Sequence, residues 1–119
     1  PVDTKKAAYD KAMSEGRALM KSGNYAAAYK AFDVALKQAP GDRAAAAERT
    51  DAFAASWVKA GRGQLEKKQY AEARKSFDEA LKAKPGDKDA LDGRRQAEAG
   101  LKAPPPMGNE AAYAEAMKK

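Results

Sequence analysis

The side chains that most often carry catalysis are missing from this sequence. It contains no histidine and no cysteine, so it lacks the commonest general base and any thiolate nucleophile or metal ligand. Its four serines (Ser14, Ser22, Ser56 and Ser76) have no catalytic motif around them. The Pro-Gly-Asp segments that end at Asp42 and Asp87 do not match the spacing of a calcium-binding loop. We therefore predict no enzyme activity, cofactor or metal, which leaves binding.

Two arginines have neighbours that suit the binding of a partner. Apolar residues flank each of them at helical spacing, in two rows of three: Met13, Arg17 and Met20, then Val58, Arg62 and Leu65. A guanidinium group can hold a carboxylate through two hydrogen bonds, and methionine is an adaptable apolar contact. The rows therefore suit a peptide that carries both apolar and acidic side chains.

An internal repeat indicates which elements position these rows. Residues 25–42 recur as residues 70–87 with twelve identities, and the same offset of 45 residues relates Gly16 to Gly61. The apolar positions follow the helical period, and Pro40 ends the second helix of the first unit. Each unit therefore predicts two helices joined by a tight turn.

The repeated residues resemble those of the tetratricopeptide repeat family. They are Gly16, Leu19, Gly23, Tyr25, Ala28, Phe32, Ala35 and Pro40 in one unit, and Trp57, Gly61, Tyr70, Ala73, Phe77, Ala80 and Pro85 in the other. The resemblance implies an all-α superhelix, or solenoid, of antiparallel helix pairs. The two glycines would allow close helix crossings, and the aromatic side chains would fill the space between pairs.

The repeat is longer than the family period of about 34 residues. The offset leaves eleven extra residues, Arg43 to Phe53, which correspond to about three turns of helix. The insertion therefore lengthens the following helix without rotating its buried face. We predict one continuous helix from Arg43 to Lys67.

The predicted organisation has five parts. Residues 1–42 form the first helix pair, 43–87 the second pair with its extended first helix, 88–102 a capping or irregular helix, 103–108 a proline linker, and 109–119 the start of a truncated further repeat. Arg94 and Arg95 fall where the family has small or apolar residues, which is why the third part is set apart. Because residues 111–117 are similar to residues 7–13, we expect the chain to belong to a longer repeat protein.

Proteins of the resembled family hold an extended peptide or a partner helix on a concave surface lined by their first helices. By this resemblance, the groove here is formed by Met13, Arg17, Met20, Lys21, Val58, Arg62, Leu65 and Glu66. The alternative is that the two rows pack against neighbouring second helices. The family's clamp for chaperone tails has an asparagine where Arg17 and Arg62 stand, so the resemblance does not extend to that class of ligand.

The leading function is therefore that of a scaffold for protein–protein interaction. Self-assembly by stacking of units between chains is one alternative, since uncapped solenoid ends are sticky. RNA binding is another, because the net charge of +6 attracts acidic partners, but the interleaved aromatic and basic residues that stack on bases are lacking. No apolar run approaches the ~20 residues of a membrane span. The sequence indicates no compartment, and the cytoplasm is only a default.

Overall fold

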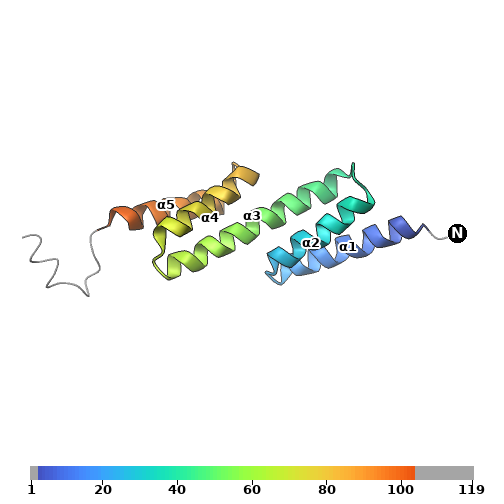
Figure 1. Cartoon of the computed structure of the whole chain (residues 1–119), viewed down its shortest axis with the longest axis horizontal. Coiled ribbons are helices and arrows are strands. Elements are labelled where there is room, and N and C mark those ends of the chain that lie inside the picture. The colour runs from blue at the N-terminus through green and yellow to red at the C-terminus, as the bar shows by residue number, and fades with distance from the viewer. Residues whose placement is uncertain (1–2, 104–119) are drawn as a thin grey trace, which may run out of the picture.

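The computed structural model describes residues 3–103, and this part of the chain consists of helices and short turns. The five helices are α1 (Thr4–Lys21), α2 (Tyr25–Gln38), α3 (Arg43–Glu66), α4 (Tyr70–Ala83) and α5 (Lys88–Lys102). They form an elongated stack in which α3 joins the two ends (Figure 1). The predicted repeat start at 109–119, and the predicted linker beyond Ala103, lie outside the described residues.

Local sequence signals explain where the helices begin and end. The side chains of Asp3, Asp42 and Asp87 accept hydrogen bonds from backbone N–H groups in the first turns of α1, α3 and α5. The turns within the two helix pairs contain one residue of left-handed conformation each, Gly23 with φ 81° and Lys68 with φ 61°. The helical character predicted for every segment from Thr4 to Leu101 is confirmed.

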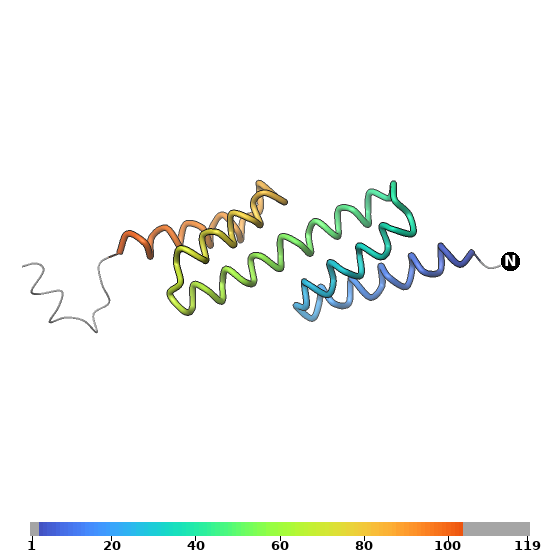
Figure 2. The backbone as a smooth tube through the Cα atoms, viewed as in Figure 1, coloured from blue at the N-terminus to red at the C-terminus, as the bar shows by residue number. Residues whose placement is uncertain are grey.

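The long helix α3 is shared by the two ends of the molecule. It is unbroken from Arg43 to Glu66, which confirms the single helix predicted from the eleven-residue insertion. Its first half packs against α2 and its second half packs against α4, while α5 packs mainly against α4 (Figure 2). The insertion therefore moves the second helix pair along α3, away from the first.

Two separate cores follow from this arrangement. One contains Ala12, Met13, Ala28, Phe32, Ala35, Ala45 and Ala52, and the other contains Ala54, Val58, Ala73, Phe77, Ala80, Ala90 and Ala97. Both are rich in alanine, which lets helix backbones approach closely. Phe32 and Phe77 are the largest fully buried side chains in the described chain, so each core is built around one aromatic ring.

Glycines make room for these rings, as the repeat predicted. A Cβ atom added to Gly16 would lie closer than 3.0 Å to the ring of Phe32, and one added to Gly61 would lie 2.6 Å from the ring of Phe77. A Cβ atom added to Gly93 of α5 would also lie too close to the ring of Phe77. Phe77 is therefore held between α3 and α5, which the resemblance alone did not reveal.

Some contacts of α5 repeat those of the first half of α3. The ion pair between Asp33 of α2 and Arg49 of α3, 2.7 Å long, has its counterpart 45 residues later in Asp78 and Arg94, 3.0 Å apart. The capping aspartates and the buried alanines of the two helices are also related by this offset. The segment predicted as a capping or irregular helix thus occupies the place of another first helix, and Arg94 belongs to the repeat.

Candidate functional site

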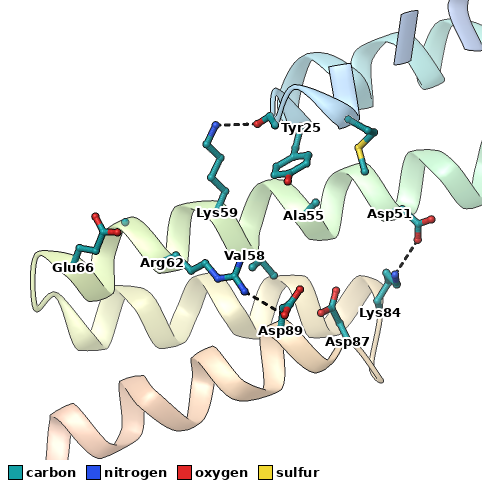
Figure 3. Close-up of a pocket in the computed structure, with 13 residues that line it drawn as sticks. Tyr25, Asp51, Ala55, Val58, Lys59, Arg62, Glu66, Lys84, Asp87 and Asp89 are labelled. Atoms are coloured by element: carbon teal, nitrogen blue, oxygen red, sulfur yellow. Dashed lines mark hydrogen bonds and ion pairs between the residues drawn. The ribbon is translucent and has the colours of Figure 1, made fainter. Parts of the chain in front are cut away.

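A large hollow lies along α3, where the two ends of the described chain meet. It has a volume of about 700 Å³ and is bounded by the α1–α2 turn, the middle of α3 and the corner between α4 and α5 (Figure 3). It is lined by Met20, Gly23, Tyr25, Asp51, Ala55, Val58, Lys59, Arg62, Gly63, Glu66, Lys84, Asp87 and Asp89. The lengthened helix creates this space, because the insertion separates the α1–α2 turn from the second pair.

Two smaller hollows continue this surface toward the start of the chain. The nearer, of about 320 Å³, is lined by Arg17, Met20, Lys21, Phe32, Glu48 and Asp51. The farther, of about 500 Å³, is lined by Tyr9, Asp10, Met13, Ser14, Arg17, Ala18 and Lys21. The large hollow and the nearer one share Met20 and Asp51, and the nearer and the farther one share Arg17 and Lys21. We call the three together the groove.

The predicted partner-binding residues fall into three classes. Met13 and Val58 are only 3% and 5% exposed, so they belong chiefly to the two cores, as the alternative interpretation of the rows expected. Met20 and Leu65 are half-buried against the same cores. The exposed members are Arg17, Lys21, Arg62 and Glu66. All eight except Leu65 line the groove.

Each of the two arginines is engaged by a carboxylate from the next first helix. Arg17 of α1 donates two hydrogen bonds of 2.9 Å to Glu48 of α3, one to each carboxylate oxygen. Arg62 of α3 lies 3.2 Å from Asp89 of α5. The pKa of Arg17 is raised, first by the hydrogen bond with Glu48 and then by its charge. Each arginine therefore already binds a carboxylate of the chain itself.

Three further side chains that shape the large hollow, those of Asp51, Lys59 and Lys84, were not predicted from the sequence. Lys84, at the end of α4, pairs with Asp51 of α3 at 3.0 Å and closes one side. The ammonium group of Lys59 donates a 2.9 Å hydrogen bond to the carbonyl of Gly23 and lies 5.9 Å from the ring centre of Tyr25. These partners come from different helices, so no spacing within one helix could have indicated them.

The groove is nearly neutral although the whole chain carries a charge of +6. Its basic side chains are Arg17, Lys21, Lys59, Arg62 and Lys84, and its acidic ones are Asp10, Glu48, Asp51, Glu66, Asp87 and Asp89. The excess positive charge must lie on other surfaces. A polyanion attracted to the chain would therefore gain little in the groove itself.

A cluster of aromatic side chains forms a different surface of α3. Tyr29 of α2 contacts Phe53 at 5.7 Å between ring centres, and Phe53 contacts Trp57 at 6.4 Å. The guanidinium of Arg49 lies 5.7 Å from the centre of the Tyr29 ring. Trp57 is half-buried and packs against the second core, which agrees with the packing role that the resemblance implied.

The N-cap of α3 is tied to α1 at the far end of the groove. The carboxylate of Asp42 accepts hydrogen bonds from the hydroxyl of Tyr9 and from the backbone N–H of Ala45. These two bonds, in that order of size, hold the pKa of Asp42 below its usual value, and desolvation opposes them in part. The hydrogen bond from Tyr9 of α1 to Asp42 therefore favours the ionised form of Asp42 in the folded chain.

Acid is expected to weaken this link. The pKa of Asp42 is lower in the folded state than the value of about 3.9 in the unfolded chain, so its contribution is complete above that value and is lost as the pH falls through the folded pKa. In urea unfolding, Tyr9→Phe should be less stable than the wild type at neutral pH, and the difference should shrink as the pH falls below the pKa of Asp42 in the unfolded chain. A difference that does not change with pH would show that the hydroxyl acts independently of Asp42 ionisation.

Comparison of the chain with protein-family models, with curated proteins and with solved structures found no match. Among residues 3–103, no helix is both long and apolar enough to cross a membrane. The same described range contains no group of three or more acidic side chains placed to hold a metal ion. The groove is therefore the feature from which a function can be inferred.

Proposed function

We propose that this chain is a tetratricopeptide-like solenoid module whose function is to bind an extended peptide segment of a partner protein. The observation that carries the proposal is the continuous groove along the first helices α1 and α3, which reaches the start of α5. In this proposal the helix pairs are scaffold, and the groove is the concave binding surface that the resemblance implies.

The composition of the groove supports a peptide ligand. The apolar side chains of Met20, Tyr25, Ala55 and Val58 line the large hollow, and charged side chains surround them. Binding sites commonly combine an apolar lining with a few fixed polar groups, and a volume of about 700 Å³ is within their usual range. Several side chains of an extended peptide can be accommodated along the three hollows.

The preferred peptide carries acidic as well as apolar side chains. Arg17 and Arg62 each hold a carboxylate in the folded chain, so their positions and orientations suit this group. RNA is a weaker candidate, because the charges of the groove are balanced and phosphate binding depends on a concentration of positive charge.

Self-assembly is a second candidate function because of two exposed leucines. Leu91 and Leu101 of α5 are about half exposed, although α5 packs its alanines and glycines against α4. Stacking of another copy on this surface of α5 would bury them. Sedimentation velocity at increasing protein concentration tests this directly, and Leu91→Glu should abolish any dimer that forms this way.

A groove-filling substitution tests the proposed peptide binding. Peptides are selected from a displayed random library with the wild-type chain, and their affinities are measured by fluorescence anisotropy. Ala55→Arg places a long side chain in the large hollow and should weaken binding at least about tenfold, or 1.4 kcal/mol. Ala47→Arg is the matched control, because Ala47 is exposed on the same helix and does not line the groove.

The control also defines the outcome that would reject the proposal. Affinity should change less than about twofold in Ala47→Arg, since exposed substitutions away from a site have small effects. Equal weakening by both substitutions would place the peptide outside the groove. A selection that enriches no peptide would reject the binding function.

A further inference from the structure

The two groove arginines hold their internal carboxylates in different ways. Arg17 makes two hydrogen bonds of 2.9 Å to Glu48, whose side chain is 29% exposed. Arg62 makes a single contact of 3.2 Å with Asp89, and these side chains are 60% and 68% exposed. Arg17 is itself 57% exposed, so the two pairs differ in the geometry of the contact and in the exposure of the carboxylate, and a bidentate pair is stronger than a single contact. The Arg62 pair is therefore the easier of the two to open.

Opening the pair would leave Asp89 in a favourable position. Asp89 lies in the first turn of α5, where the positive end of the helix dipole stabilises a carboxylate. Because the side chain is also well exposed, water can replace the guanidinium as its partner. The carboxylate of Glu48, in contrast, lies within α3 and receives both hydrogen bonds of its arginine.

We infer that Arg62 is the exchangeable anchor of the groove: a carboxylate of the bound peptide displaces Asp89 from Arg62, while Arg17 keeps Glu48. This inference depends on the proposed peptide-binding function. Figure 3 shows the arrangement that supports it, with the Arg62 guanidinium and Asp89 at the border of the large hollow and Val58 next to them. The half-buried side chains of Met20, Tyr25 and Ala55 line the same hollow, so an acidic and a neighbouring apolar side chain of one peptide can be bound together.

Asp89 then acts as an internal competitor of the ligand. While Asp89 is paired with Arg62, the peptide carboxylate cannot bind there. The apparent affinity for the peptide is therefore the intrinsic affinity multiplied by the fraction of molecules in which Arg62 is free. Exposed ion pairs contribute up to about 1 kcal/mol, which corresponds to about a fivefold reduction. The strength of the Arg62–Asp89 pair therefore sets how tightly the groove holds an acidic peptide.

The test measures binding to the full chain of a fluorescein-labelled peptide that carries a single glutamate next to leucine in an otherwise uncharged sequence. Asp89→Asn should bind it about two- to fivefold more tightly than the wild type. The matched control is Asp92→Asn, which removes the same charge from an exposed position on the same helix, outside the groove. Its affinity should lie within about 1.5-fold of the wild type, because Asp92 pairs with Arg95 and does not compete for Arg62.

A double-mutant cycle isolates the exchange from general electrostatics. Arg62→Gln should weaken binding, and Asp89→Asn should have no further effect in that background, because the competing pair no longer exists. Equal gains from Asp89→Asn and Asp92→Asn, or a gain that persists without Arg62, would overturn the exchange and leave the proposed function intact. If neither the wild type nor any variant binds the peptide, the proposal that the ligand is an acidic peptide is wrong.

Discussion

Phe77→Ala is expected to lower the free energy of unfolding by about 3–5 kcal/mol, the usual cost of removing a buried phenylalanine ring. The ring is fully buried in the second core and lies between Gly61 of α3 and Gly93 of α5. Its removal leaves a cavity shared by three helices, and rigid backbones at two close crossings limit the collapse of that cavity. Urea unfolding followed by far-UV circular dichroism measures the effect.

Val34→Ala is the control for this prediction. Val34 is an exposed apolar side chain on α2, so its truncation should change the free energy of unfolding by no more than about 0.5 kcal/mol. If Phe77→Ala cost as little as Val34→Ala, the ring would not be the centre of the second core. The arrangement of α3, α4 and α5 around it would then be wrong.

Gly61→Leu is expected to destabilise the fold by about 1–3 kcal/mol, the typical range for overpacking. A Cβ atom at this position would lie 2.6 Å from the Phe77 ring, and the remaining leucine atoms would need still more space. The α3–α4 crossing must therefore widen. Gly16→Leu should have the same effect on the α1–α2 crossing, because its Cβ would meet Phe32.

Gly63→Leu is the control for this prediction. It shows whether a loss of stability comes from the steric clash or from replacing any glycine of α3 by leucine. Gly63 lies on the same helix, and an added Cβ would have no atom within 4 Å. Leucine is a better helix former than glycine by somewhat less than about 1 kcal/mol, so this variant should be as stable as the wild type or more stable. A loss of stability in Gly63→Leu equal to that in Gly61→Leu would exclude the crossing as the cause.

The fold was largely predictable because its signals are local. Asp42 and Asp87 cap helices, Pro40 ends one, and the eleven-residue insertion preserves the helical phase of α3. Helix formation depends on residues up to four positions apart, all of which are visible in the sequence. The repeat also predicted that Gly16 and Gly61 lie at close helix crossings, because equivalent positions of two repeat units are expected to pack in the same way.

The site was predictable only in outline, because its geometry depends on helices far apart in the sequence. All residues of the two rows except Leu65 line the groove, yet two of the apolar members, Met13 and Val58, are mostly buried. The spacing could not show that Arg17 is bound by Glu48 or Arg62 by Asp89, because those carboxylates lie on the next first helix. Nor could it show that Arg94 of α5 pairs with α4.

The sequence by itself determined the helices, their ends and the positions of the small residues at the crossings, since these depend on backbone propensity, capping and the helical period. The tertiary structure decided which side chains of each helix meet a partner, how far α3 separates the two cores, and where the groove lies. Those features depend on the distance and rotation between packed helices, which are set by close packing of Phe32 and Phe77 against glycines. The spacing of residues along the sequence indicates neither the distance nor the rotation between packed helices.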